Sequence, residues 1–316
     1  MESEEAEQTL EAEIEEPEGS IDVSIHELLP IPVAHEAPKL DELEAGVRHR
    51  VDRVRQLTDA DHQALRAFLL RDRMMAAYQL GDLDDPFIEH TRWFGVDSPE
   101  EGLTGVLLWY SGLSMPAILP MGSPDDVMAL LARARTLLPR KIFASHPLTH
   151  TDAFAQYYRP ITVKPVLRMS LQRSDWRPQP SEPAPNETIE KLTHRDTAAI
   201  MQLYRYYPDN FFEPAQLDTG MYFGVKQAGE LVSVAGIHVL SDAQDIAVVG
   251  NMVTHAGKRG QGLATKSVSR VLQAIFERVG YVALNVAEDN ASAIACYRKF
   301  GFEVHCRLQE GWMERL

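Results

Sequence analysis

Two short patterns recur along the chain at nearly equal spacing and point to an internal repeat. Residues 57–61 (LTDAD) resemble residues 192–196 (LTHRD), 135 positions later, and both lead into an apolar-periodic helix. Residues 153–157 (AFAQY) and 293–297 (AIACY) lie 140 positions apart. We favour two copies of one fold over two unrelated domains. In the first pattern the threonine is expected to cap a helix that has the aspartate in its first turn.

The length and composition fit two domains of moderate size. With 316 residues and 45% hydrophobic content, the chain is too long for one ordinary core. Four prolines between residues 178 and 185 predict a stiff, exposed linker. We therefore expect a first domain over residues 47–173, a linker over residues 174–186 and a second domain over residues 187–316.

Most of the negative charge lies in an amino-terminal tail. Residues 1–46 contain fifteen acidic residues and one basic residue, Lys39, and so carry −14 of the net charge of −15. Repeated glutamates, several prolines and few aromatics predict that this tail is disordered. Docking of residues 21–33 onto a partner or onto the chain's own domain is the alternative. The remaining chain is nearly neutral, which argues against a nucleic-acid-binding surface.

Cysteine content and apolar patterning favour a cytoplasmic protein. Only Cys296 and Cys306 occur, too few for a disulfide framework, so a reducing compartment is expected. The long uncharged run at residues 103–122 contains glycines and prolines that suit a buried hairpin better than a membrane span. Neither cysteines nor histidines have a metal-ligand spacing, so no metal is expected. The oligomeric state stays open, with a homodimer as one alternative.

The second half is predicted to be mixed α/β structure around one sheet. The expected order is a helix at residues 196–204, a hairpin of residues 221–225 and 231–240, a strand at 246–254, a glycine turn, a helix to about residue 278, a strand at 281–286, a helix at 290–299 and a closing strand at 302–307. The glycine turn therefore lies between a strand and a helix.

This glycine turn has the chemistry of a phosphate site. Residues 258–265 (KRGQGLAT) open a helix, whose unsatisfied N–H groups and positive dipole end favour an anion. Gly260 and Gly262 let the backbone approach that anion, and Lys258, Arg259 and Lys266 add positive charge. The missing lysine–serine ending disfavours ATP, and the position after a middle strand disfavours a dinucleotide fold. A tight loop with incidental charge is the alternative.

Two motifs stand in order on the turn and on the later helix. Arg259, Gly262 and Ala264 form an R-x-x-G-x-A pattern, and residues 290–302 contain Asn-x-x-Ala-x-x-x-Tyr followed by Phe-Gly-Phe. Together these motifs resemble the acetyl-CoA turn and the last helix of the GNAT superfamily of N-acetyltransferases. The resemblance covers residues 187–316 and is closest to the glycine-N-acyltransferase-like branch, because Thr254 and a histidine precede the turn. One departure is Ala256, where that branch usually has proline.

The resemblance implies acetyl-CoA as co-substrate and, in each domain, a mostly antiparallel central sheet flanked by helices. It also implies that the backbone of residues 252–254 pairs with the pantetheine arm. The residues implied in cofactor binding are Met252, Val253, Thr254, Arg259, Gly260, Gln261, Gly262, Leu263, Ala264, Thr265, Asn290 and Tyr297.

Tyr297 is the candidate general acid. Acyl transfer from a thioester to an amine needs a proton for the departing thiolate, and a phenol with a pKa of about 10 can supply it. The family resembled has its proposed acid at this helix position, and packing under the cofactor is the alternative role. The strand before the turn offers no glutamate as general base at residues 248–251. Glu213 and His238 are the candidates, with a water relay as the alternative.

The first half is expected to lack a cofactor. Its equivalent turn, residues 119–126, carries Asp125 and Asp126, whose charge repels a pyrophosphate. This half is expected to wall the acceptor channel or to stabilise the second half. The sequence thus predicts an N-acyltransferase that acetylates a small-molecule amine. The alternatives are a CoA-binding regulatory module and an enzyme that acetylates proteins.

Overall fold

The computed structural model describes residues 43–316, except for residues 86, 113–115 and 208–209. All of these described residues belong to one compact unit, Glu36–Leu316. The first repeat contains α1 (Ala45–Val51), β1 (Val54–Gln56), α2 (His62–Leu69), α3 (Ala77–Gly81), β2 (Thr91–Ser98), β3 (Gly102–Tyr110), β4 (Ala117–Gly122), α4 (Pro124–Ala134), β5 (Lys141–Pro147), α5 (Thr151–Ala155) and β6 (Tyr158–Gln172). The second contains β7 (Glu187–Lys191), α6 (Thr197–Leu203), β8 (Phe223–Gln227), β9 (Glu230–Ser241), β10 (Ile246–Thr254), α7 (Leu263–Phe276), β11 (Tyr281–Ala287), α8 (Ala291–Phe300) and β12 (Glu303–Arg315).

The order of elements confirms two copies of one fold. Apart from α1 and α3 of the first copy, each copy has a strand, a helix, three antiparallel strands, a helix, a strand, a helix and a last strand, so β1 to β6 correspond to β7 to β12. Within each copy one pair of strands is parallel, β4 with β5 and β10 with β11. The predicted mixed α/β class, with a mostly antiparallel sheet flanked by helices, is therefore confirmed.

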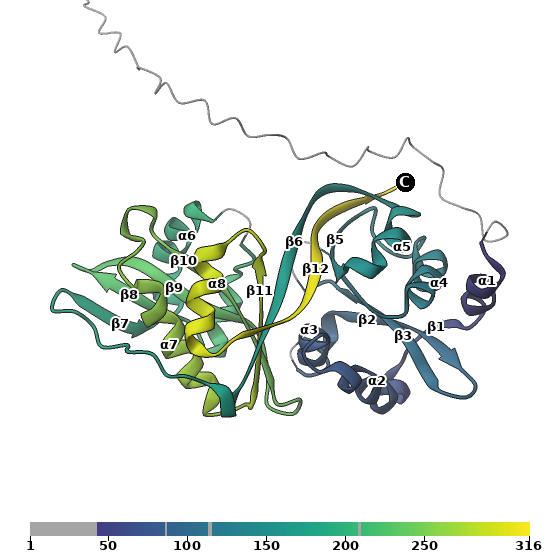
Figure 1. Cartoon of the computed structure of the whole chain (residues 1–316), viewed down its shortest axis with the longest axis horizontal. Coiled ribbons are helices and arrows are strands. Elements are labelled where there is room, and N and C mark those ends of the chain that lie inside the picture. The colour runs from purple at the N-terminus through teal and green to yellow at the C-terminus, as the bar shows by residue number, and fades with distance from the viewer. Residues whose placement is uncertain (1–42, 86, 113–115, 208–209) are drawn as a thin grey trace, which may run out of the picture. The chain divides into compact units, whose positions relative to one another are not determined.

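The two copies share one sheet because they exchange their last strands. The strand order is β1-β2-β3-β4-β5-β12-β6-β11-β10-β9-β8-β7. Thus β12 pairs with β5 of the first copy, and β6 pairs with β11 of the second. Figure 1 shows β6 (teal) and β12 (yellow) side by side, where they pair with each other. The two repeats therefore fold as parts of one unit.

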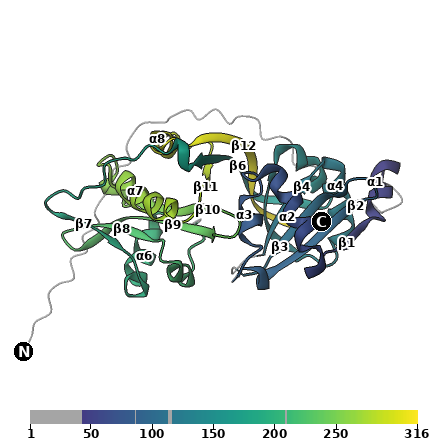
Figure 2. The ribbon, with the colours of Figure 1, turned by 90° about the horizontal axis from the view of Figure 1, so that it is seen from below.

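Helices cover both faces of the second repeat's sheet. Figure 2 shows α7 and α6 on opposite sides of β8 and β9. The alternation of β9 fits this arrangement, since Ile237 packs in the core beneath α7 and Val234 packs in the core beneath α6. The first repeat's α3 also packs on β9 and β10, so one repeat covers part of the other's sheet.

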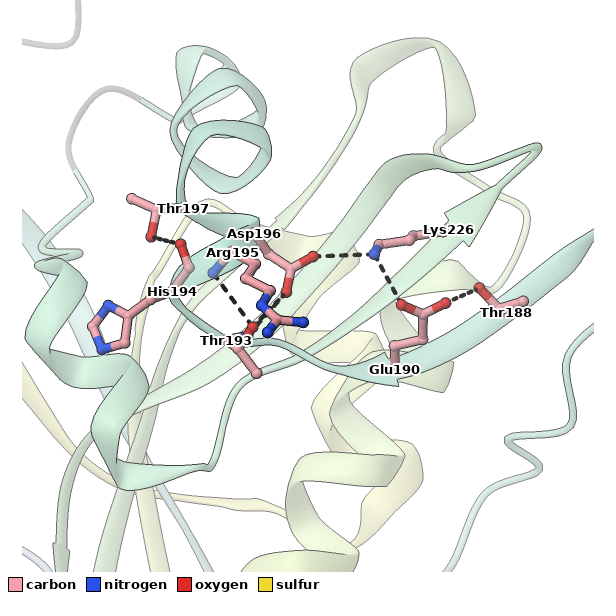
Figure 3. A network of polar contacts seen from close by, with 8 residues as sticks. All are labelled: Thr188, Glu190, Thr193, His194, Arg195, Asp196, Thr197 and Lys226. Carbon is pink, nitrogen blue, oxygen red and sulfur yellow. Dashed lines mark hydrogen bonds and ion pairs between the residues drawn. The ribbon is translucent and has the colours of Figure 1, made fainter.

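Both predicted helix starts are capping boxes. The Thr58 N–H donates to the Asp61 carboxylate at 2.8 Å, and the Thr193 N–H donates to Asp196 at 3.0 Å. In the second repeat, Figure 3 shows Lys226 between Asp196 and Glu190, at 3.0 and 2.9 Å. This lysine ties the start of α6 to β7 and β8.

Several predicted elements of the second repeat are confirmed, although β7 was not predicted and several element ends differ. The strand at residues 246–254 is β10, and residues 103–122 form the antiparallel pair β3 and β4. The closing strand was predicted to end at residue 307, whereas β12 continues to Arg315 because it pairs with β5 and β6. Helix α1 begins at Ala45, inside the predicted disordered tail, and Leu43 is buried in the hydrophobic core of the first repeat. Residues 1–42 of that tail lie outside the described residues.

The proline-rich linker makes hydrogen bonds and a ring contact with the second repeat. The Gln179 amide donates to the Lys299 carbonyl at 2.9 Å, and Ser269 donates to the Gln179 carbonyl at 2.8 Å. Trp176 packs against Phe276. Hydrogen bonds therefore attach the predicted stiff linker to the second repeat, while most of its residues are exposed. Among the helices that the structure describes, none has the length and apolar character to cross a lipid bilayer.

Candidate active site

Strand β10 loses its partner on one side halfway along its length. The parallel ladder joins Ile246–Val248 to Tyr281–Ala283 and then stops. The β9 ladder continues to Thr254 with a register shift after Gly250, where Asn251 has a φ of 52°. This β-bulge turns the strand beside the end of the ladder. The backbone of residues 252–254 is thus without a β11 partner, as a pantetheine arm requires.

Asn251 holds the bulge in place. Its carbonyl accepts from the Tyr204 hydroxyl at 2.7 Å, and its side-chain amide donates to the Tyr222 hydroxyl at 2.9 Å. The Phe211 N–H donates to its side-chain oxygen at 3.2 Å. A non-glycine residue at positive φ is strained, so these contacts stabilise a conformation that the chain would otherwise avoid.

The glycine turn leaves a run of N–H groups open. Gly260 and Gly262 have φ values of 79° and 75°, which L residues rarely adopt, and Gly262 caps α7 without a side chain. Within the described ranges, no protein group accepts a hydrogen bond from the N–H groups of residues 260–265. A helix N-terminus with such unsatisfied donors favours a phosphate. The residues present therefore fit the pyrophosphate of acetyl-CoA.

The charge at this turn is smaller than the sequence predicts. The Lys266 ammonium forms an ion pair with Glu187, whose carboxylate also accepts from the Ala184 N–H at 3.0 Å. Across the residues described, neither Lys258 nor Arg259 forms an ion pair, and Arg259 is exposed. The positive charge available to an anion thus comes from Lys258 and Arg259, and the predicted contribution of Lys266 is wrong.

Other residues of the predicted cofactor set have contacts within the protein. Leu263 is buried against Val225 and Val232. The Gln261 side chain contacts Gln227 at 3.4 Å, and the Thr265 hydroxyl lies 3.6 Å from the Cys296 sulfur. Asn290 caps α8, since its side-chain oxygen accepts from the Ala293 N–H at 3.2 Å and from the Ser292 hydroxyl. The turn, α7 and the start of α8 therefore form one fixed corner.

Tyr297 lies on α8 and is 7% exposed. Its ring packs edge-on against Phe302. Burial raises its pKa, and the neighbouring Cys296 and Tyr207 raise it further, so the phenol keeps its proton at neutral pH. No group among the described residues bonds its hydroxyl, so a ligand is free to do so.

A cavity of about 710 Å³ lies between the repeats, and both candidate bases line it. Glu213 precedes the short helix at Pro214–Thr219, and His238 lies on β9. Burial lowers the pKa of His238 to about 4, so its imidazole is neutral at pH 7. A Cβ at Gly250 would lie 1.9 Å from the His238 ring, so the cavity meets β10 next to the bulge.

Three further acids line this cavity and were not predicted from the sequence: Asp82, Glu310 and Asp218, which pairs with His194. Asp82 follows α3 and is 6% exposed, and its carboxylate has no hydrogen-bond or ion-pair partner among the described residues. Glu310 lies on β12, beyond the predicted end of the closing strand. Tyr207 also lines the cavity and is an electrostatic neighbour of Tyr297, which connects the cavity to the candidate acid. No spacing in the sequence signals these residues, because strand exchange and repeat packing bring them together.

The equivalent turn of the first repeat is closed by its own side chains. The Ser123 hydroxyl accepts from the Asp126 N–H at 3.2 Å and donates to the Asp126 carboxylate. Asp126 is 3% exposed and forms an ion pair with Arg50 at 3.0 Å. The Asp126 carboxylate thus occupies the N-terminus of α4, where a bound anion would otherwise lie.

Comparison with known proteins agrees with this geometry. Residues 186–302 match the Acetyltransferase (GNAT) family. The matched residues lie in the second repeat. An uncharacterised protein of Mycobacterium leprae, ML0378, is 30% identical over 148 residues, which cover 44% of this chain and 40% of that protein.

Solved structures share the fold over both repeats. A putative GNAT acetyltransferase from Novosphingobium aromaticivorans has a TM-score of 0.53 at 21% identity, over 78% of this chain and all of that one. A tandem GNAT protein from the clavulanic acid biosynthesis pathway has a TM-score of 0.52 at 17% identity, over 83% of this chain and 98% of that one. At these identities the likeness concerns the fold.

Proposed function

We propose that this protein is an acetyl-CoA-dependent N-acetyltransferase whose acceptor is a small-molecule amine. The observation that carries the proposal is the open run of N–H groups at residues 260–265 beside the unpaired edge of β10. The GNAT match over residues 186–302 supports acetyl transfer. The adjoining cavity of about 710 Å³ suits a small acceptor better than a folded protein.

The residues of the second repeat divide between binding and chemistry. Acetyl-CoA would supply the acetyl group as a thioester. The N–H groups of residues 260–265 and the Arg259 charge would hold its pyrophosphate, and residues 252–254 would pair with its pantetheine arm. Tyr297 would give its proton to the departing thiolate. Glu213 and His238 line the cavity as candidate bases.

We further propose that the first repeat binds no acetyl-CoA. Asp126 and Ser123 already satisfy the α4 N-terminus, and a second anion there would be repelled. This repeat instead contributes Tyr78, Asp82 and Phe143 to the cavity wall. We place the protein in the cytoplasm, because its two cysteines suit a reducing compartment.

The finer family assignment and two other functions are testable alternatives. Thr254 and the following histidine favour the glycine-N-acyltransferase-like branch. A CoA-binding regulatory module without turnover would use the same turn. Acetylation of a protein would use the acidic tail, of which residues 1–42 lie outside the described residues, to attract a basic substrate or other partner.

The test is turnover with acetyl-CoA and a panel of small primary amines, followed by thiol release and by mass spectrometry of the N-acetylated product. The proposal predicts product with at least one amine. Binding of acetyl-CoA without any product would favour the regulatory module. Acetylation of a basic protein that is lost on deletion of residues 1–42, with no turnover of small amines, would favour the protein substrate.

A further inference from the structure

A buried polar network lies where the two repeats exchange strands. Arg168 on β6 is 1% exposed and donates to the Met74 and Met75 carbonyls at 3.0 and 2.8 Å. It also donates to the side-chain oxygen of Asn285 on β11. This fixes the Asn285 amide, because its NH₂ group must then point away from Arg168.

That NH₂ group donates to Glu310. The same carboxylate oxygen, Oε1, accepts from the Ser145 hydroxyl at 2.8 Å. The other oxygen, Oε2, has no hydrogen-bond partner among the described residues, and Glu310 lines the cavity. The network therefore fixes the Glu310 carboxylate while leaving one oxygen for a ligand.

Strand exchange is what creates this arrangement. Ser145 pairs with Glu310 across β5 and β12, and Asn285 pairs with Arg168 across β11 and β6. These two pairs occupy equivalent positions in the two repeats. If the β10–β11 register continued past Val248, Asn285 would stand level with Gly250 at the bulge. Glu310 is thus held by Asn285, a residue of the strand next to β10.

The rest of the cavity also favours a cation. The acids on its wall are Asp82, Glu213, Asp218 and Glu310. Arg278 is the one lysine or arginine among the described lining residues, and it forms an ion pair with Asp242. The apolar part of the wall includes the rings of Tyr78, Tyr110, Phe143 and Phe211. Acids and aromatic rings together suit an ammonium group on an apolar body.

We propose that this cavity binds a small primary amine in its ammonium form, with an aromatic or apolar body, and that Glu310 Oε2 holds the ammonium and takes its proton. The inference rests on the proposed function and adds the class of acceptor and the proton acceptor. Burial raises the pKa of Glu310, while Ser145, Arg168, Asn285 and Lys164 oppose that rise. Tyr78 is a further titratable neighbour of Glu310.

The proton balance of the step is complete. The ammonium gives one proton to Glu310, and the freed lone pair forms a C–N bond with the thioester carbonyl carbon. The C–S bond breaks, and the thiolate takes a proton from Tyr297. The nitrogen loses its second proton, which restores Tyr297, and Glu310 releases its proton to solvent. The products are an N-acetyl amine, free CoA thiol and one proton.

The test is calorimetric titration of 2-phenylethylammonium, and of uncharged 2-phenylethanol, into the full chain without acetyl-CoA. Wild type is expected to bind the ammonium and to bind the alcohol at least about tenfold more weakly. Glu310→Gln is expected to weaken ammonium binding by about tenfold or more, because it removes a charge-assisted hydrogen bond. Glu314→Gln, the same change on the same strand where the acid pairs with Arg140 and Arg159, is the matched control with wild-type binding.

Separate titration with acetyl-CoA distinguishes failure of this inference from failure of the proposed function. Glu310→Gln with wild-type acetyl-CoA affinity shows a folded variant with an altered acceptor site. Unchanged ammonium binding in Glu310→Gln, equal binding of the alcohol, or no ammonium binding by wild type would overturn the inference. Ammonium binding that depends on Glu310 in a chain that does not bind acetyl-CoA would support the site and contradict the proposed function.

Discussion

At the scale of single residues, the side chain with the clearest expected effect on catalysis is Tyr297. Its phenol is buried, protonated and without a hydrogen-bond partner among the described residues. Tyr297→Phe keeps the ring and removes the proton donor, so kcat is expected to fall by about 10² or more. The acetyl-CoA dissociation constant is expected to change by less than about threefold, because the ring still packs on Phe302.

Steady-state kinetics with a turned-over amine, together with calorimetry, check this prediction. Tyr158→Phe is the matched control, since it removes another buried phenol whose hydroxyl has no partner, outside the site. Unchanged turnover in Tyr297→Phe would remove this residue from the mechanism.

Single residues also show how far sequence reasoning reaches. The turn at residues 258–265 is predictable because its glycines, charges and following helix are neighbours along the chain. The hydrogen bonds that hold Asn251 are not predictable, since its partners Tyr204, Phe211 and Tyr222 come from separate segments. Glu310 is missed for the same reason, because its partners lie on β5 and β11.

At the scale of elements, the packing of α3 on the other repeat's sheet leaves no room for a side chain at Gly81. A Cβ at Gly81 would lie 1.7 Å from the nearest Val239 methyl group on β9. Gly81→Ala is therefore expected to push α3 away and to lower the free energy of unfolding by about 1–3 kcal/mol.

Thermal and urea unfolding measure this effect. Gly46→Ala is the matched control, because a Cβ at Gly46 in α1 meets nothing within 4 Å. Higher helix propensity predicts a neutral or slightly stabilising change there. Equal stability of both variants would show that α3 does not pack tightly on β9.

Elements also explain why the repeat is faint in the sequence. Arg55 on β1 binds Asp61 and Asp97, whereas Lys226 on β8 binds Asp196 and Glu190. Arg55 pairs with Gly95, and Glu190 pairs with Gly224, so the two networks are equivalent with the strand charges reversed. The two repeats thus keep the same network of ion pairs although the residues that form it differ. The strand exchange itself is not predictable from the sequence, since no local pattern in β12 indicates that it pairs with β5.

At the scale of the whole molecule, a buried histidine affects how stability depends on pH. His146 is 1% exposed and stacks on Phe154, and burial lowers its pKa from 6.5 to about 4. Between these values the unfolded chain binds a proton that the folded chain does not. Its contribution to stability is therefore present above pH 6.5 and is lost as the pH falls towards 4.

His146→Gln is expected to make the dependence of unfolding free energy on pH shallower by up to about 1.4 kcal/mol per pH unit in that window. Asp82 and Glu310, whose pKa values are raised by burial, act in the opposite direction. Asp82 and Glu310 are present in both wild type and His146→Gln, so the difference between the two pH slopes reports on His146. Urea unfolding at several pH values measures it, and an identical slope would contradict the prediction.

The central claim is one acetyl-CoA site per chain, on the second repeat. Calorimetric titration of acetyl-CoA into wild type, Arg259→Glu and Arg133→Glu tests it most directly. Arg133 lies exposed on α4 of the first repeat and is the matched charge reversal. We predict one equivalent for wild type and Arg133→Glu, and binding at least about tenfold weaker for Arg259→Glu, where a charge-assisted contact is replaced by repulsion. No binding by wild type, two equivalents, or full binding by Arg259→Glu would contradict the account.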